Sequence, residues 1–201
     1  MKRIILFTRF PEPGSTKTRL IEKLGPEGAA GLQQQMTEWI AAEIAGLQGS
    51  GAITAEIHYE GGDAAKMAQW LGPRFIYRKQ EGGDLGRRMA IAFRSAFADH
   101  MQQVVIMGSD CPAITAAVID KALRKLTECD LVLGPTFDGG YYLIGLNRME
   151  ESLFQGIDWG TKEVLAQTVE RAGQANLAVC LLEKLHDVDR PEDLDIPELP
   201  L

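Results

Sequence analysis

The chain has 201 residues, 45% of them hydrophobic and 24% charged, a composition typical of a soluble globular protein and not of a disordered or collagen-like one. Its formal net charge of −7 is opposite to that of proteins whose main work is binding a nucleic-acid backbone, and an anionic membrane surface would also repel it on average. This length suffices for a full hydrophobic core, so we expect one domain over residues 1–201.

The cysteine pattern and the N-terminal segment indicate a reducing compartment. The chain has three cysteines and no C-x-x-C pair, so we predict neither a zinc site nor a thioredoxin-like motif. The apolar run that begins the sequence is too short for the core of a signal peptide. No apolar run approaches the roughly 20 residues that span a bilayer. We therefore expect a cytoplasmic protein with no membrane partner.

Apolar runs bounded by turn residues recur along the chain and predict strands. They lie at 4–7, 53–59, 75–77, 104–107, 131–133, 141–146 and 177–182. The run 4–7 is apolar throughout, which is typical of a strand buried on both faces. By contrast, residues 53–59 alternate apolar and polar side chains, which predicts a strand with one partly exposed face.

Segments with a helical apolar period separate these strands and predict helices. They lie at about 26–48, 63–71, 84–98, 115–127 and 161–173. The apolar face of the first predicted helix is expected to carry Leu32, Met36, Trp39, Ile40, Ile44 and Leu47. Strands that alternate with helices predict crossover units, and hence one α/β domain with a mainly parallel sheet. Ligands of such sheets bind beyond the carboxyl ends of the strands, where polar residues follow Phe7, Met107 and Leu182.

A cationic loop follows the first predicted strand. It contains Arg9, Lys17 and Arg19, together with Gly14 and the hydroxyl group of Thr18. Glycine lets backbone N–H groups approach a phosphate, and the cations offset the phosphate charge. The spacing is not that of a Walker A loop. The segment is therefore either a phosphate-binding loop or an ordinary solvated one.

Acidic residues follow two further strands. Asp110 lies just past a buried run, where its carboxylate can reach an ion at the edge of the sheet, because Mg²⁺ prefers one or two carboxylates with phosphate and water. The alternative is a turn before Pro112. Asp187 and Asp189 follow the last strand and point to the same side if the chain is extended. Asp189 either completes a metal site with Asp110 or caps a short helix that begins at Pro191.

Two glycine-rich segments could contact a ligand. In the first, Gln80 could read the edge of a nucleotide base, and Gly83 could let the base lie against the backbone. Asp84 in the same segment is also a good helix N-cap. In the second, Asp138 and the two glycines after it are a turn signal in any case.

Five segments, taken in this order, resemble the DUF2064 family. They are FPEPGSTKTRL (10–20), GGDLGRRM (82–89), GSDCP (108–112), DGGYYLIGL (138–146) and DVD (187–189). That family is often labelled a glycosyltransferase family, and one branch is associated with arsenosugar biosynthesis. The resemblance covers roughly residues 4–195. It implies a single three-layer α/β/α domain with the nucleotide-diphospho-sugar transferase (glycosyltransferase type-A) fold, in a superfamily that also holds nucleotidyltransferases.

The resemblance also implies roles for individual residues. Those expected to bind the nucleotide are Arg9, Gly14, Lys17, Thr18, Arg19, Gln80, Gly83 and Asp84. Those expected near the sugar or the acceptor are Asp138, Gly139, Gly140 and Tyr141. Asp110 would bind Mg²⁺ or Mn²⁺ and act in catalysis together with Lys17, and Asp189 would assist as a second metal ligand.

One departure from the pattern concerns the D-x-D acid pair of many type-A glycosyltransferases. The matching triplet here, Gly108-Ser109-Asp110, keeps only the last acid. A second acid must therefore come from elsewhere in the chain. Asp189 is the expected partner, Asp138 is its rival, and Asp187 is less favoured.

The expected function is that of a metal-dependent transferase that acts on a nucleotide-sugar donor. The alternatives are a nucleotidyltransferase, which moves a nucleoside monophosphate from a triphosphate to a phosphorylated acceptor, and a nucleotide-binding protein without turnover. The expected partners are a nucleotide sugar or nucleoside triphosphate and a small-molecule acceptor, and no nucleic acid.

Overall fold

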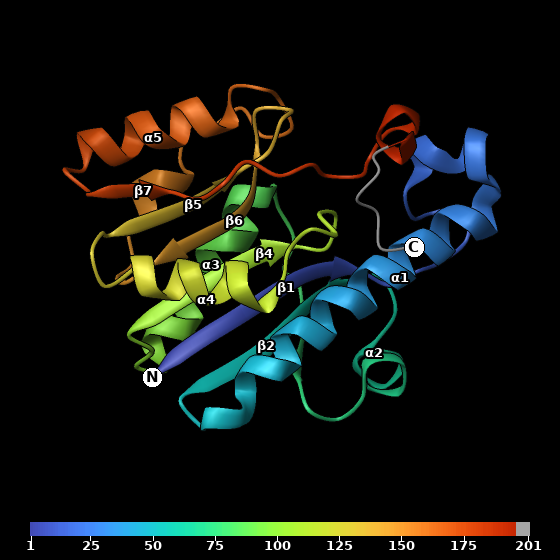
Figure 1. Cartoon of the computed structure of the whole chain (residues 1–201), viewed down its shortest axis with the longest axis horizontal. Helices are drawn as coiled ribbons and strands as arrows, with labels where there is room; N and C mark the ends of the chain where they lie inside the picture. The colour runs from blue at the N-terminus through green and yellow to red at the C-terminus, as the bar shows by residue number, and fades with distance from the viewer. Residues whose placement is uncertain (196–201) are drawn as a thin grey trace.

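A seven-stranded sheet forms the middle layer of the fold (Figure 1). The computed structural model describes residues 1–195. Among these the strands follow the order β3-β2-β1-β4-β6-β5-β7, and β6 alone runs antiparallel to its neighbours. The strand bounds are β1 (Lys2–Arg9), β2 (Ile53–Glu60), β3 (Ile76–Lys79), β4 (Gln103–Gly108), β5 (Leu131–Pro135), β6 (Tyr141–Leu146) and β7 (Val179–Leu181).

Helices cover both faces of the sheet. One face packs against α1 (Ile21–Leu47), α2 (Ala64–Leu71) and α4 (Ala116–Lys125), and the other against α3 (Leu85–Ala98), α5 (Val164–Gln174) and the short 3-10 helix η3 (Glu151–Phe154). The predicted three-layer α/β/α arrangement with a mainly parallel sheet is confirmed. No helix within residues 1–195 is long and apolar enough to cross a membrane.

The central strand β1 is buried on both faces, as its uninterrupted apolar run predicts. Ile4 and Leu6 join the apolar cluster beneath α1, α2 and α4, whereas Ile5 and Phe7 join the cluster beneath α3 and α5. Burying a side chain of this size stabilises the fold by about 1.5–3 kcal/mol. Alternate side chains of one strand therefore attach both helical layers to the sheet.

The prediction that β2 has a partly exposed face is wrong. Glu56 is only 2% exposed and His58 only 6%. The Glu56 carboxylate is 2.8 Å from His58 Nε2, accepts a hydrogen bond from Arg78 Nε at 3.0 Å, and lies 3.1 Å from Arg3 Nη1. Charged side chains can be buried when they compensate one another, so the alternating pattern here marks a buried polar layer and not a solvated face.

The first helix largely follows its sequence pattern. Gly25 has a left-handed φ of 70° that interrupts the helix, so its long regular part begins at Pro26, as predicted. Met36, Ile40 and Ile44 are buried at four-residue spacing. Trp39, however, is 40% exposed, because it lies about 100° around the helix from Ile40 and misses this stripe.

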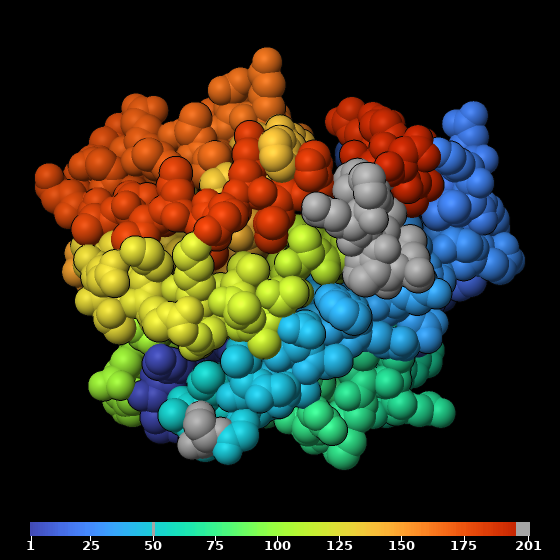
Figure 2. Space-filling view, viewed as in Figure 1, coloured from blue at the N-terminus to red at the C-terminus, as the bar shows by residue number. Residues whose placement is uncertain are grey.

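The parallel strands end at one edge of the sheet, and a later segment of the chain crosses that edge. After β7 the chain is joined to β5 by a bridge between Thr136 and Leu185, and the N–H of Val188 donates to the carbonyl of Asp110 at 2.8 Å. Val188 then packs with Leu20 beside α1. Figure 2 shows the surface of this red segment running from the β7 side toward the blue N-terminal part of the chain.

Replacing Gly134 in β5 by alanine should lower the free energy of unfolding by about 1–3 kcal/mol through overpacking. A Cβ at Gly134 would lie 2.3 Å from Cζ of the buried Tyr142 ring. The matched control is Gly31→Ala in α1, where a Cβ meets nothing within 4 Å. That substitution should raise the free energy of unfolding by about 0.5–1 kcal/mol. Urea unfolding midpoints measure both. Equal midpoints for the two variants would show that the Tyr142 ring moves aside without loss of stability, which contradicts the prediction.

Candidate functional site

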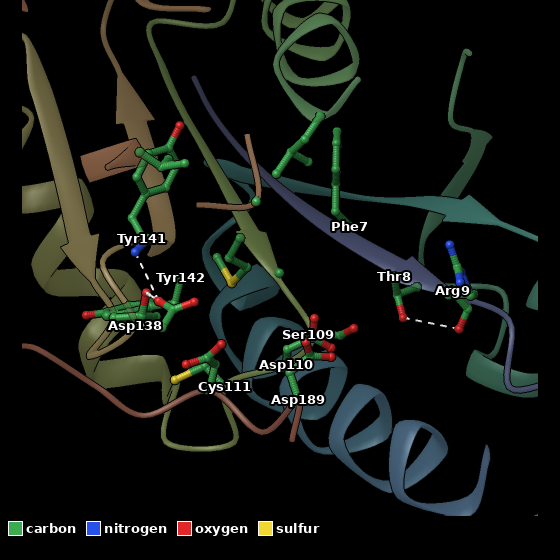
Figure 3. Close-up of a pocket in the computed structure, with 18 of the residues that line it drawn as sticks. Phe7, Thr8, Arg9, Ser109, Asp110, Cys111, Asp138, Tyr141, Tyr142 and Asp189 are labelled. Carbon is green, nitrogen blue, oxygen red and sulfur yellow. Dashed lines mark hydrogen bonds between the residues drawn. The ribbon is translucent and has the colours of Figure 1, made fainter. Parts of the chain in front are cut away.

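A cavity of about 1000 Å³ opens at the edge where β1, β4 and β5 end. Figure 3 shows Thr8 and Arg9 at one end, Asp138 and Tyr142 at the other, and Asp110 between them. The walls come from the loop after β1, the end of β4, the β5–β6 turn and the segment 186–193. This is where an open parallel sheet is expected to bind its ligands.

Most of the sequence-predicted site residues meet in this cavity. Those that line it are Arg9, Lys17, Thr18, Arg19, Gln80, Asp110, Asp138, Gly140, Tyr141 and Asp189. Those that do not are Gly14, Gly83, Asp84 and Gly139. The two groups differ in kind, because the second consists of three glycines that shape loops and one residue that begins a helix.

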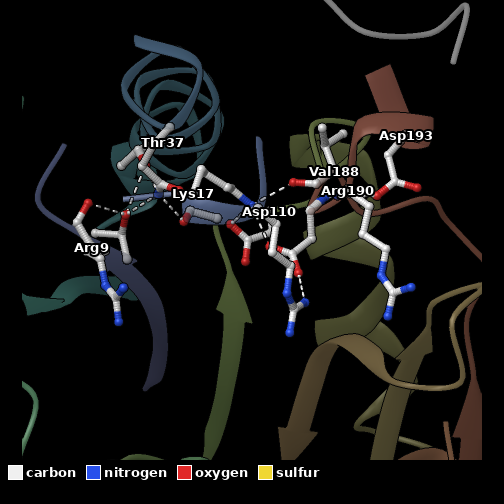
Figure 4. Close-up of polar contacts among 12 residues, drawn as sticks. Arg9, Lys17, Thr37, Asp110, Val188, Arg190 and Asp193 are labelled. Atoms are coloured by element: carbon white, nitrogen blue, oxygen red, sulfur yellow. Dashed lines mark hydrogen bonds and ion pairs between the residues drawn. The ribbon is translucent and has the colours of Figure 1, made fainter. Parts of the chain in front are cut away.

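The charged centre of the site is a lysine between two carboxylates (Figure 4). Lys17 Nζ lies 2.7 Å from Asp110 Oδ1 and 3.8 Å from Asp189 Oδ1, and donates to the Val188 carbonyl at 2.6 Å. Its side chain is only 4% exposed, whereas that of Asp110 is 50% exposed. Lys17 also has a left-handed φ of 50°. The two predicted metal ligands therefore lie close to one nitrogen atom.

Asp189 is not the cap of the short helix that follows it. Its carboxylate pairs with Arg19 and faces Lys17. Asp193, within that helix, reaches back, and its Oδ2 accepts hydrogen bonds from the backbone N–H groups of Asp189 at 3.0 Å and Arg190 at 2.7 Å. The carboxylate of Asp189 is thus held at the cavity by side-chain charges.

A second charged group lies at the Arg9 end of the cavity. Glu60 Oε2 accepts hydrogen bonds from Arg9 at 2.8 Å and Arg88 at 3.3 Å, and the hydrogen bond from Arg9 is the main cause that holds the pKa of Glu60 below its usual value. Gln80 Oε1 also accepts from Arg88 at 3.0 Å, while its amide nitrogen donates to the backbone carbonyls of Thr8 and His58. Gln80 thus holds the Arg88 side chain and links the ends of β1 and β2. Arg88 lies in a segment that carries the family resemblance, but sequence reasoning gave it no role.

Asp84, Asp138 and Gly139 have structural roles, as a helix cap or as parts of turns. Asp84 caps α3 by accepting from the N–H of Arg87 at 2.8 Å. Asp138 Oδ1 accepts from Thr136 Oγ1 at 2.5 Å and from the N–H of Gly140 at 3.0 Å, so it closes the β5–β6 turn while still bordering the cavity. A Cβ at Gly139 would lie 2.2 Å from the Lys162 carbonyl oxygen, so that glycine allows two loops to pack closely.

Three features of the cavity escaped the sequence reasoning wholly or in part. Asp187 lines the wall, and burial, followed by the charge of Asp138, raises its pKa to about 6. Phe137 and His186 stack at the rim with ring centroids 4.0 Å apart. Trp159 packs on Gly86, where a Cβ would lie 2.5 Å from the indole ring. The i, i+2 spacing from Asp189 signalled Asp187, and the place of His186 beside Asp187 put that histidine near the sheet edge, but no local pattern signalled Phe137 or Trp159.

The chain matches a family model over residues 44–161. The family is described as "Uncharacterized protein conserved in bacteria (DUF2064)". No curated protein matches the chain.

Solved structures give a consistent comparison. A "putative nucleotide-diphospho-sugar transferase" from Desulfovibrio desulfuricans G20 is 40% identical, with a TM-score of 0.90 over 96% of this chain and 84% of that one. CMP:2-keto-3-deoxy-manno-octonic acid synthetase complexed with CTP is 11% identical, with a TM-score of 0.58 over 96% and 95%. The inositol-1-phosphate CTP transferase from T. maritima is 13% identical, with a TM-score of 0.55 over 96% and 91%.

The two distant structures show the fold alone. The family match covers more than half of the chain and contains three of the five segments that resemble the family, those at 82–89, 108–112 and 138–146. The sheet order and the relative at 40% identity agree with the same fold. The chain therefore belongs to the DUF2064 family and has the nucleotide-diphospho-sugar transferase fold.

Proposed function

We propose that the protein is a metal-dependent transferase that uses a nucleotide-sugar donor. The observation that carries this proposal is the cavity edge, where Lys17 and Arg19 stand beside the carboxylates of Asp110 and Asp189. A nucleotide diphosphate needs both kinds of group, because cations offset its charge and carboxylates hold a metal ion against it. The relative at 40% identity, described as a "putative nucleotide-diphospho-sugar transferase", supports the same substrate class.

The cationic residues differ in how available they are to a phosphate. Arg19 is 63% exposed and Arg9 is 46% exposed, so both can turn their guanidinium groups toward a ligand at little cost. Guanidinium groups bind phosphate oxygens in pairs, which orients the ligand as well as attracting it. We assign the leaving diphosphate to this side of the cavity, where growing negative charge is stabilised best.

The residues present fit a divalent ion such as Mg²⁺ or Mn²⁺. Asp110 and Asp189 offer only oxygen ligands, and both border the cavity. Within residues 1–195 no group of three metal-binding side chains occurs. The remaining ligands would therefore be phosphate and water, as is usual for Mg²⁺.

When bound, such an ion supplies charge neutralisation to the phosphates. The chain's own residues position the ion and the substrates. Asp110 and Asp189 fix the ion's position, Arg19 orients the diphosphate, and Asp138 and Tyr141 border the space left for the sugar or the acceptor. The Phe137–His186 stack and Trp159 line this same space and limit its width.

A nucleotidyltransferase is the second candidate. One observation favours it: the site has a single acid in the triplet 108–110, unlike the acid pair of many type-A glycosyltransferases. Cationic side chains suit attack on an α-phosphate equally well, since phosphoryl transfer depends mainly on positioning and charge neutralisation. Two distantly similar structures of the same fold are described with CTP as ligand or substrate. Because they share only the fold with this chain, they support a nucleotidyltransferase by analogy.

The deciding experiment is a matched pair of turnover assays with Mg²⁺ or Mn²⁺. Release of a nucleoside diphosphate from a nucleotide sugar supports the first function. Release of pyrophosphate from a triphosphate only when a phosphorylated acceptor is added supports the second. Nucleotide binding with neither reaction would contradict both and leave a binding protein without turnover.

Replacing Asp110 by asparagine should remove the metal-dependent part of nucleotide binding, because the variant loses the charge that holds the ion. We expect the increase in melting temperature with nucleotide to become the same with Mg²⁺ as with EDTA, since only ligands of the native state raise it. Asp120→Asn, on the exposed face of α4, is the matched control. Unchanged metal dependence in Asp110→Asn would remove this residue from the metal site.

Replacing Arg19 by glutamine should weaken nucleotide binding by about 1.5–3 kcal/mol, the usual contribution of a charged hydrogen bond. Binding of the nucleoside without phosphates should hardly change. Calorimetric titration with both ligands measures the difference, and Arg124→Gln on α4 is the control for lost charge. Equal losses for nucleoside and nucleotide would point to a damaged fold.

Replacing Asp187 by asparagine should raise the melting temperature at pH 7.5 in EDTA. The folded-state pKa of Asp187, about 6, lies above its ordinary value of 3.8, so the folded state binds the proton more tightly than the unfolded state. Wild-type stability therefore falls as the pH rises from about 4 to 6 and stays lower above that range. The variant lacks this loss, and the two proteins should converge near pH 4. A less stable variant at pH 7.5 would contradict the assignment, and Glu27→Gln is the control.

A further inference from the structure

We propose that the ammonium group of Lys17 occupies the divalent-ion position while no ion is bound, and that Lys17 must leave it for the ion to bind both carboxylates. This inference rests on the metal dependence in the proposed function. It gives Lys17 two successive roles, first as a counter-ion of the site and then as a phosphate contact.

The contacts of Lys17 are those of a counter-ion. An ammonium group has three donors. One donates to the Val188 carbonyl at 2.6 Å, while the nitrogen forms an ion pair with Asp110 Oδ1 at 2.7 Å and lies 3.8 Å from Asp189 Oδ1. Because the side chain is only 4% exposed, little of the charge faces the cavity. In this arrangement Lys17 is poorly placed to bind a phosphate.

The same contacts exclude a bridging ion. Mg²⁺ takes oxygen ligands at about 2.0–2.1 Å, so two carboxylates that both bind it would lie within roughly 4 Å of each other with the ion against both. The Lys17 nitrogen already lies 2.7 Å from Asp110 Oδ1 and 3.8 Å from Asp189 Oδ1. An ion bound to both carboxylates would lie next to the Lys17 ammonium group, and two positive charges that close repel each other strongly in a partly buried site. Lys17 and a bridging ion therefore compete for one position.

The side chain can move without the loop. Thr16 Oγ1 donates to the Phe10 carbonyl at 3.1 Å and accepts from the N–H of Glu12 at 3.1 Å, so the backbone before Lys17 is held in place. Lysine has a long flexible stem with four methylene groups, and Lys17 already lines the cavity. Rotation about that stem would carry the ammonium group from the carboxylates to the space where phosphates bind.

This exchange couples the two ligands. Once released, Lys17 adds a positive charge to the phosphate side of the cavity, so metal binding should strengthen nucleotide binding. By linkage, nucleotide then strengthens metal binding by the same factor. The coupling needs no movement of a domain or lid.

The test is a titration with Mn²⁺ in the absence of nucleotide, followed by the electron paramagnetic resonance signal of the free ion. The variant Lys17→Met keeps the length of the stem and removes the charge. We expect it to bind Mn²⁺ about 10- to 100-fold more tightly than the wild type, the equivalent of one charged hydrogen bond. Lys17→Arg keeps the charge and should show no such gain. Lys121→Met, which also removes a lysine paired with a carboxylate, is the matched control.

Two outcomes would overturn the proposal, and they differ. If Lys17→Met binds Mn²⁺ no more tightly than the wild type, Lys17 does not compete with the ion, while the proposed function stands. If no variant binds Mn²⁺ even with nucleotide present, the metal dependence itself is wrong and this inference falls with it.

A second measurement uses the wild type and so does not depend on how the variants fold. The rate of reductive methylation of Lys17, followed by mass spectrometry, should rise when Mn²⁺ is added without nucleotide, because the displaced amine is exposed. A rate that does not change at saturating Mn²⁺ would also overturn the proposal.

Discussion

The ammonium group of Lys17 lies where three segments of the chain meet, and its contacts hold them together. The lysine belongs to the loop after β1, Asp110 follows the end of β4, and Val188 belongs to the segment that crosses the sheet edge after β7. A cation this deeply buried is tolerated because carboxylates compensate it. The same compensation keeps two acids close that would otherwise repel each other. The shape of the cavity wall and its affinity for cations therefore depend on one charge.

Much of the fold could be predicted from the sequence because its apolar patterns are strong. The run 4–7 is apolar at every position, which is typical of a strand buried between two helical layers. The polar alternation of β2 misled the prediction, because pattern alone cannot distinguish solvent from an ionic partner. Glu56 is buried by pairing with Arg3, which is distant in sequence, and with Arg78. Trp39 shows a different limit, since a large apolar side chain next to a buried stripe need not belong to it.

Most of the residues named from the sequence lie together at the cavity, but their contacts were not predictable. Topology explains why they meet, because residues that follow parallel strands lie at one edge of the sheet. Their roles stay predictions. The contacts depend on distances that no local pattern records. Gln80 was expected to read a base, yet its amide donates to two strand ends. Asp189 was equally acceptable as a cap, and only the pairing of its carboxylate with Arg19, a residue distant in sequence, decides that role.

The segment that crosses the sheet edge has a consequence for how the protein is made. Residues 187–189 are synthesised after all seven strands of the sheet, yet they form the cavity wall together with the loop after β1. A nascent chain that has not reached residue 189 can complete its sheet but has a half-built wall, with Lys17 lacking the Val188 carbonyl and the second carboxylate. Completion of the cavity is thereby tied to the synthesis of this segment, which a shorter ribosome-bound fragment lacks.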